Sequence, residues 1–222
     1  MTQGVRIVLL GRQGAGKGTQ ADRLAVRYDV PHVSTGDMLR AAVKAGTEAG
    51  QRAKAVMDSG QLVSDDIMFG IVEERLSEPD AKSGYLLDGF PRTVAQARKL
   101  EEVTRDDPID AVIDLDVPED VVIERITHRR VCVSCGAIYS VEHPPTNPWD
   151  CDRCGGQVVQ RDDDTEEAVK KRLALYAEET LPLLPFYAER GLLETVDGLG
   201  TPDEVSERLA EVVDRRTDQS GS

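Results

Sequence analysis

Long apolar stretches are missing from this sequence. No run of apolar residues approaches the roughly 18 that cross a membrane, and the N-terminus lacks the charged, apolar and small-residue succession of a secretion signal. We therefore expect a cytoplasmic protein that has no membrane partner. The chain of 222 residues is long enough for one domain with sizeable insertions.

Widely spread positive charge is also missing. The formal net charge is −14, with 41 acidic residues against 27 basic ones. Proteins that grip a nucleic-acid backbone need positive charge over a broad surface, so we expect no nucleic-acid partner. Any anion that this protein binds must be held by a few local groups. Arginines beside turn-rich segments are the candidates, because one guanidinium can hold two phosphate oxygens at once.

The segment GRQGAGKGTQ, residues 11–20, has the pattern of a phosphate-binding loop but lacks one of its usual groups. It follows the apolar run VRIVLL and opens a helical pattern, which is the order of strand, loop and helix that such loops need. Backbone amides from Gly14 to Thr19 can surround phosphate oxygens, and Lys17 can reach the outer phosphates. Directly after Lys17 stands Gly18, where the usual loop has a hydroxyl that helps to hold magnesium.

A carboxylate elsewhere is the natural substitute for this missing hydroxyl. Asp88 ends the apolar run YLLD, at the carboxyl end of a predicted strand, where an open α/β sheet places its ligand-binding groups. The alternative is an aspartate that only begins the turn DGFPR. We favour a role for Asp88 in holding magnesium.

Strand and helix patterns alternate along the chain. Five short apolar runs predict strands: VRIVLL (5–10), PHVST (31–35), YLLD (85–88), AVIDLDV (111–117) and LLETVD (192–197). Of the intervening amphipathic helices, one begins after Ser64 and has Ile67, Ile71 and Val72 on one face, and another begins at Pro202. This alternation predicts an α/β protein whose parallel sheet is covered by helices on both faces.

Cysteine occurs only in two short pairs. Cys132, Cys135, Cys151 and Cys154 form two C-x-x-C motifs, and each motif is followed by a glycine that lets backbone amides turn toward sulfur. Four thiolates favour a tetrahedral structural zinc site, since a cytosolic chain keeps its thiols reduced. Two disulfides or a redox-active pair are the alternatives. We expect His143, outside both pairs, to be a surface residue.

Several segments together resemble one family, the adenylate kinases among the nucleoside monophosphate kinases. They are GAGKGTQ with its glycine after the lysine, STGDMLR (34–40), GQLVSD (60–65), LLDGFPRT (86–93) with Gln96 following, and QRDDD (160–164). The resemblance covers about residues 5–213. It implies a three-layer P-loop fold with a five-stranded parallel sheet, of the form whose long lid carries a four-cysteine zinc site.

The resemblance also implies how the chain is divided and what it does. The core would comprise residues 1–34, 64–130 and 162–216, with an AMP-binding insertion at 35–63, a zinc-binding lid at 131–161 and a disordered tail at 217–222. The implied reaction is reversible, magnesium-dependent phosphoryl transfer from ATP to AMP, giving two ADP, by a monomer with a structural zinc ion. A kinase for UMP, CMP or GMP is the alternative.

The resemblance assigns both nucleotide sites residue by residue. The residues that would contact ATP are Gly14, Ala15, Gly16, Lys17, Gly18, Thr19, Arg129, Ile138, Tyr139 and, through its backbone, Gly200. Those that would contact AMP are Thr35, Arg40, Gln61, Leu62, Val63, Gly89, Phe90, Pro91, Arg92, Gln96, Arg161 and Arg172. The catalytic set would be Lys17, Asp88, Arg92, Arg129, Arg161 and Arg172, whose cations stabilise charge on the transferring group.

Two other classes of protein share parts of these patterns. A nucleotide-switch GTPase would have a hydroxyl directly after Lys17 and an N-K-x-D motif, and the sequence has neither. A zinc module that binds nucleic acid would be basic, whereas the segment 132–154 contains one arginine and several acids. The sequence therefore favours the kinase.

Overall fold

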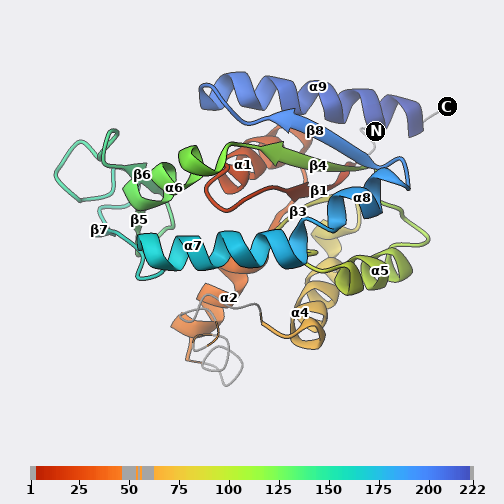
Figure 1. Cartoon of the computed structure of the whole chain (residues 1–222), viewed down its shortest axis with the longest axis horizontal. Coiled ribbons are helices and arrows are strands. Elements are labelled where there is room, and N and C mark those ends of the chain that lie inside the picture. Colours follow the sequence, from red (N-terminus) through yellow and green to blue (C-terminus); the bar gives the residue numbers. More distant parts are fainter. Residues whose placement is uncertain (1–3, 47–53, 55, 57–62, 221–222) are drawn as a thin grey trace.

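A parallel sheet of five strands forms the centre of the molecule, in the order β2-β3-β1-β4-β8 (Figure 1). The computed structural model describes residues 4–46, 54, 56 and 63–220. The strands are Arg6–Leu10 (β1), His32–Ser34 (β2), Tyr85–Asp88 (β3), Ala111–Asp116 (β4) and Leu193–Asp197 (β8). All neighbouring pairs are parallel, so the five predicted strands and the fold class are confirmed.

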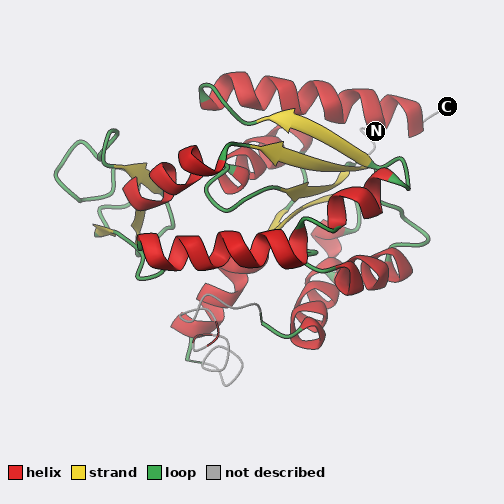
Figure 2. Ribbon diagram, viewed as in Figure 1, coloured by secondary structure: helices red, strands yellow, loops and turns green. Residues whose placement is uncertain are grey.

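Helices cover both faces of this sheet and make three layers (Figure 2). Ile7 and Leu9 of β1 pack into one core, whereas Val8 and Leu10 pack into the other. The first core is completed by Lys17–Tyr28 (α1), Glu119–His128 (α6), Glu166–Leu175 (α7) and Pro202–Ser220 (α9). The second is completed by Thr35–Lys44 (α2), Asp65–Ser77 (α4), Val94–Val103 (α5) and Leu183–Ala188 (α8). Because successive strand residues point to opposite faces, both sides of the sheet are buried.

Helix α4 begins after Ser64 as predicted, and two of the three residues predicted to share its apolar face turn toward the core. Val72 is buried and Ile71 packs against the second core, whereas Ile67 is 41% exposed. Met68 and Phe69, which were not predicted for this face, are buried as well. Burying Met68 and Phe69 removes more apolar surface from water than burying Ile67 would.

A second, smaller sheet lies at one end of the molecule. Its antiparallel strands are Arg129–Cys132 (β5), Ile138–Ser140 (β6) and Val158–Val159 (β7), in the order β6-β5-β7. Its small core contains the buried residues Cys132, Ala137, Cys151 and Val158. In Figure 1 the arrows of β4 and β8 point toward the side where this sheet lies, so it stands near the carboxyl ends of the central strands.

The C-terminal helix is longer than the sequence suggested. Thr201 and Glu204 cap its start reciprocally: Thr201 N donates to Glu204 Oε2 at 2.8 Å, and Glu204 N donates to Thr201 Oγ1 at 3.3 Å. We expected a disordered tail from residue 217, but α9 continues through Ser220. No glycine or proline interrupts residues 203–220, so nothing breaks the helix there. No helix among the described residues combines the length and apolar character needed to cross a membrane.

Candidate active site

One cleft gathers the residues that the sequence singled out. Its volume is about 1070 Å³, which reaches the upper end of the range of roughly 300–1,000 Å³ for sites that hold one small ligand. Every residue predicted to contact a nucleotide lines this cleft, as far as the structure describes these residues. Gln61 and Leu62 lie outside the described residues. The structure therefore brings the described members of the predicted set together around one large cleft.

The phosphate loop turns sharply because two of its glycines adopt a left-handed backbone. Gly14 has φ 85° and Gly16 has φ 104°, conformations that favour glycine. A Cβ at Gly14 would lie 2.6 Å from Ile126 Cγ1, so the loop also packs too closely on α6 for a side chain. No side chain caps the N-terminus of α1. Its first amides can therefore face an anion in the cleft.

Lys17 folds back over this loop. Its Nζ donates to Gly11 O at 2.8 Å and to Arg12 O at 3.0 Å. Burial lowers the pKa of Lys17, and the nearby carboxylate of Asp88 acts in the opposite direction. The lysine thus supplies a positive charge, shielded from water, at the point where the loop meets the sheet.

Asp88 lies at the end of β3 and faces the position that lacks the usual hydroxyl. A Cβ added at Gly18 would lie 3.7 Å from Asp88 Oδ2. Burial alone would raise the pKa of Asp88, but the nearby His32 ring and the charge of Lys17 outweigh burial and lower the pKa. The side chain is therefore an anion at neutral pH. Ionised carboxylate oxygens suit magnesium, so this position fits the ion that we expected Asp88 to hold.

His32 and Asp22 support this carboxylate and were not identified from the sequence. His32 Nε2 lies 3.5 Å from Asp88 Oδ2, and its Nδ1 lies 2.8 Å from Asp22 Oδ1. Burial opposes the charge on the ring, but Asp22 and Asp88 outweigh burial and raise the pKa of His32 to about 9. The register of the sheet explains the contact, since β2 lies beside β3 and places Ser34 opposite Asp88. The order of strands in a sheet cannot be read from a sequence pattern, so this contact could not be predicted.

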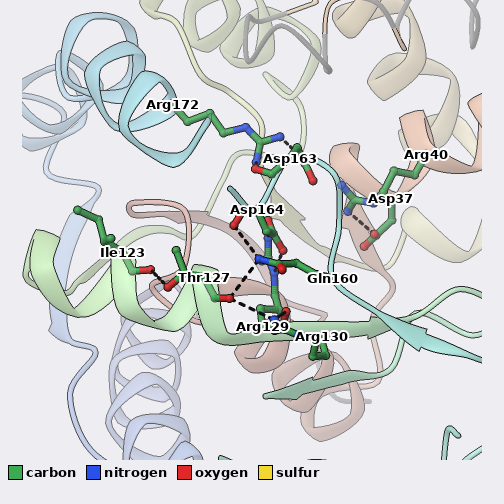
Figure 3. A network of polar contacts seen from close by, with 10 residues as sticks. All are labelled: Asp37, Arg40, Ile123, Thr127, Arg129, Arg130, Gln160, Asp163, Asp164 and Arg172. Atoms are coloured by element: carbon green, nitrogen blue, oxygen red, sulfur yellow. Dashed lines mark hydrogen bonds and ion pairs between the residues drawn. The ribbon is translucent and has the colours of Figure 1, made fainter. Parts of the chain in front are cut away.

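Acidic residues hold two of the predicted arginines in place. Arg129 Nε and Nη2 donate to the two carboxylate oxygens of Asp164 at 2.8 and 2.5 Å, and Asp164 is fully buried. Arg172 pairs with Asp163, the residue before Asp164 in the sequence. In Figure 3, Gln160 adds a second link, since its Nε2 donates to Asp164 O at 3.1 Å and to Thr127 O at 3.2 Å. The two-point contact between Arg129 and Asp164 fixes the plane of the Arg129 guanidinium.

Arg161 lies close to these ion pairs but has no acidic partner of its own among the described residues. It forms no salt bridge with any residue in the described part of the chain. Burial and the charges of Arg40 and Arg129 lower its pKa to about 10, so it is still a cation at neutral pH. Arg40 pairs with Asp37 across one turn of α2 (Figure 3). The cluster therefore has an excess of positive charge that an anion in the cleft can neutralise.

The corner of the cleft beside α5 is built around Arg92. Its Nε donates to Gly89 O at 2.8 Å, and Thr35 Oγ1 donates to the same oxygen at 2.9 Å. Arg92 N donates to Gln96 Oε1 at 2.7 Å. Burial, assisted by the charges of Arg172 and Arg40, lowers the pKa of Arg92. Leu39, Val63 and Met68 add apolar surface to this part of the cleft.

The four cysteines converge in the small sheet. Their Sγ atoms lie within 4.8 Å of one another, with 3.5 Å between Cys132 and Cys154 and 3.6 Å between Cys135 and Cys151. All four are free thiols, so the alternative of two disulfides does not hold in this structure. Four sulfurs around zinc at about 2.3 Å would lie ~3.8 Å apart, so the spacing fits a tetrahedral metal site. His143 is exposed and lies outside the cluster, where its Nδ1 is 3.5 Å from Ser140 Oγ.

Tyr139 joins this cluster to the cleft. It is one of the residues that line the cleft, and its hydroxyl lies 3.4 Å from Cys151 Sγ and accepts from Asp152 N at 2.9 Å. The hydroxyl lowers the pKa of Cys151 to about 6. Ile138, the neighbouring residue on β6, is 49% exposed and also lines the cleft.

Comparison with known proteins gives consistent matches over this whole arrangement. A family model described as Adenylate kinase matches residues 9–192, which include the phosphate loop, the arginine cluster and the four cysteines. The chain is 48% identical over 215 residues to the adenylate kinase of Thermodesulfovibrio yellowstonii, covering 96% of this chain and all of that one. It is 53% identical over 197 residues to the adenylate kinase of Moorella thermoacetica, covering 87% of this chain and 91% of that one. It is 51% identical over 197 residues to the adenylate kinase of Archaeoglobus fulgidus, again covering 87% of this chain and 91% of that one.

Proposed function

Since the chain belongs to the adenylate kinase family, we propose that its cleft transfers a phosphoryl group reversibly from ATP, bound with magnesium, to AMP and so forms two molecules of ADP. The observation that carries this proposal is that a phosphate loop and a cluster of arginines line one and the same cleft. The loop suits the phosphates of a donor nucleotide, and the second set of cations suits an acceptor that is itself an anion.

ATP would lie along the phosphate loop, with its phosphates on the amides of residues 14–19. Arg129, fixed by Asp164, would contact these phosphates from β5. The adenine would lie toward Ile138, Tyr139 and Gly200. Gly200 has φ 113°, and a Cβ there would lie 2.7 Å from Glu204 Oε2. Any contact that residue 200 makes with the base must therefore come from its backbone.

AMP would occupy the opposite corner, with its phosphate near Arg40 and Arg92 and its base beside Gln96. Thr35 and Val63 would border the base, and the turn of residues 89–91 would form the wall behind it. The mixture of apolar surface and one buried amide supports this assignment. A planar base needs apolar contact on its faces and a few hydrogen-bonding groups at its edge.

The chemistry needs positioned charge and no general base. The attacking oxygen belongs to the AMP phosphate, which is already ionised at neutral pH. Lys17, Arg161 and Arg172 would stabilise the charge that the transferring group spreads over its oxygens. Arg161 forms no salt bridge in the described part of the chain, so it would give up no partner there to do so.

Asp88 would hold magnesium, through water, beside Lys17. The evidence is its contact with the position of Gly18, where phosphate loops of the usual kind place the hydroxyl that holds the metal. When bound, the ion neutralises charge on the phosphates of ATP. His32 and Asp22 would keep the carboxylate of Asp88 in place.

The small sheet would be a lid that a structural zinc ion holds together. Cys132, Cys135, Cys151 and Cys154 would fill all its coordination positions, which leaves none for substrate. We assign residues 131–161 to this lid, 35–63 to the AMP-binding insertion, and 1–34, 64–130 and 162–216 to the core. Closure of both insertions would exclude water from the transferring group. We further propose that the protein acts in the cytoplasm as a monomer.

A panel of acceptors tests the proposed function. The zinc-loaded protein is incubated with magnesium and ATP and with AMP, GMP, CMP or UMP in turn, and ADP formation is measured. We expect rapid ADP formation with AMP, dependence on magnesium, and weak activity with the other three. Absence of transfer to AMP would refute the proposal, and transfer to CMP, UMP or GMP in preference to AMP would show a kinase of the alternative specificity.

A further inference from the structure

The amide of Gln96 has a defined orientation, although it lies at the cleft. Gln96 is 2% exposed, and its side-chain amide makes two hydrogen bonds with other residues in the described part of the chain. Its Oε1 accepts from Arg92 N at 2.7 Å, and its Nε2 donates to Asp65 Oδ1 at 2.6 Å. A backbone N–H can only donate and an ionised carboxylate can only accept. The two partners therefore admit one orientation of the amide.

Asp65 is itself held firmly behind Gln96. It lies in the first turn of α4, whereas Gln96 belongs to α5, and it is not among the residues that line the cleft. Thr93 Oγ1 donates to Asp65 Oδ2 at 3.1 Å and accepts from Gln96 N at 3.1 Å. Both carboxylate oxygens are thus used within one small network that joins the two helices.

We propose that Asp65 is a positioning and specificity-determining residue, which fixes the Gln96 amide so that its remaining N–H and its remaining lone pair recognise a 6-aminopurine. This inference rests on the proposed function, in which the acceptor base lies beside Gln96. An amide has two N–H groups and two lone pairs, and the contacts with Asp65 and Arg92 use one of each. No other described residue bonds this amide, so one donor and one acceptor are left for the base.

The edge of the base decides which purine matches. Adenine offers its amino donor beside a ring-nitrogen acceptor on either edge, whereas guanine offers its 6-oxygen acceptor beside the N1–H donor on one edge and beside the N7 acceptor on the other. Guanine that presents N1–H and the oxygen requires the reverse orientation of the amide, and guanine that presents N7 and the oxygen leaves the free lone pair of Gln96 facing an acceptor. Reversal would place Nε2 against the N–H of Arg92 and Oε1 against the carboxylate of Asp65, so two hydrogen bonds would become repulsive contacts. Asp65 thereby discriminates between bases that it does not touch.

Substitutions at Asp65 test this inference. Asp65→Ala removes the group that orients Nε2, so KM for AMP should rise ~10-fold while kcat and KM for ATP change little. The ratio of kcat/KM for AMP to that for GMP should fall ~10-fold. Calorimetric binding of AMP and GMP should show the same pattern without turnover.

Asp66→Ala is the matched control, because Asp66 is the neighbouring acid in the first turn of α4 and is exposed. It should leave both acceptors unaffected. If Asp65→Ala proves unfolded by circular dichroism, Asp65→Ser is measured instead, since its hydroxyl permits either amide orientation, and the same fall in the AMP to GMP ratio is expected. Equal losses for AMP and GMP would overturn the inference and show a merely structural role. An unsubstituted protein that fails to phosphorylate AMP would refute the proposed function instead.

Discussion

At the scale of single residues, the cleft combines cations that are paired with cations that are not. Arg129 and Arg172 each have an aspartate partner that sets their direction, whereas Arg161 has none among the residues that the structure describes. Among the described residues, Lys17 is hydrogen-bonded only to carbonyl oxygens of its own loop. We therefore expect Lys17 and Arg161 to act directly on a phosphoryl group in transfer.

Removing either of these charges should slow the chemical step with the fold intact. We expect Lys17→Met and Arg161→Ala each to reduce kcat by roughly 10²–10³-fold, because the oxygens that they face gain charge during transfer. Single-turnover measurements of ADP formation, with circular dichroism as a check on folding, give the comparison. Arg105→Ala is the control, since Arg105 is exposed, and it should behave like the unsubstituted protein. A loss as large in Arg105→Ala would show that the effect does not come from the cleft.

Sequence reasoning identified the residues of the cleft better than the contacts between them. Glycines, lysine and arginines in short motifs could be recognised because their chemistry is local to the motif. His32 was missed because its partners Asp22 and Asp88 are brought to it by strand order. The two internal hydrogen bonds of Gln96 were missed for a similar reason, since Asp65 lies 31 positions away in sequence. Pairing between distant segments has no signature in either segment alone.

At the scale of elements, apolar runs were predicted well and segments between closely spaced turns were not. β1, β3 and β4 are apolar runs that are almost wholly buried, so the pattern alone gave them. The strands of the small sheet have two to four residues and alternate with turns, so no period could be recognised in them. On α4, Ile71 and Val72 face the core as predicted but Ile67 does not, because overlapping apolar faces are resolved only by the packing partner.

The small sheet has little apolar material to hold it together. Its core consists of two cysteines, one alanine and one valine, with Tyr139 packed against them. We infer that metal binding supplies much of its folding energy. Cys135→Ser, or removal of zinc by a chelator, should lower the melting temperature by ~5–10 °C, which corresponds to about 2–3 kcal/mol for a chain of this size. Hydrogen exchange should increase mainly in residues 131–161.

Arg153→Ala is the control for this experiment, since Arg153 is exposed and lies between Cys151 and Cys154 without being a candidate ligand. It should bind one zinc ion per chain and keep its melting temperature. Activity of Cys135→Ser at moderate temperature should fall far less than that of Lys17→Met. Purified protein without metal and with four reactive thiols would contradict the zinc site, and a folded, zinc-free protein without any activity would contradict its purely structural role.

At the scale of the whole molecule, strongly negative overall charge coexists with a positive cleft. The net charge is −14, yet Lys17, Arg92, Arg129 and Arg161 line a single cavity. Concentrating the cations in this way lets the protein attract nucleotide phosphates without becoming a general binder of polyanions. We expect the donor and acceptor phosphates to lie together in this cleft, because the phosphate loop and the arginines both line it. Transfer would then occur directly from one nucleotide to the other.

The fate of the γ-phosphate tests this central claim most directly. ATP labelled in its γ-phosphate is incubated with magnesium and the zinc-loaded protein, with and without AMP, and the label is followed in ADP and in free phosphate. Because closure excludes water, we expect the label to enter ADP when AMP is present and free phosphate to form at least ~100-fold more slowly, with or without AMP. Release of labelled phosphate at a rate comparable to that of ADP labelling, whether AMP is present or not, would contradict direct transfer between two nucleotides in a closed cleft.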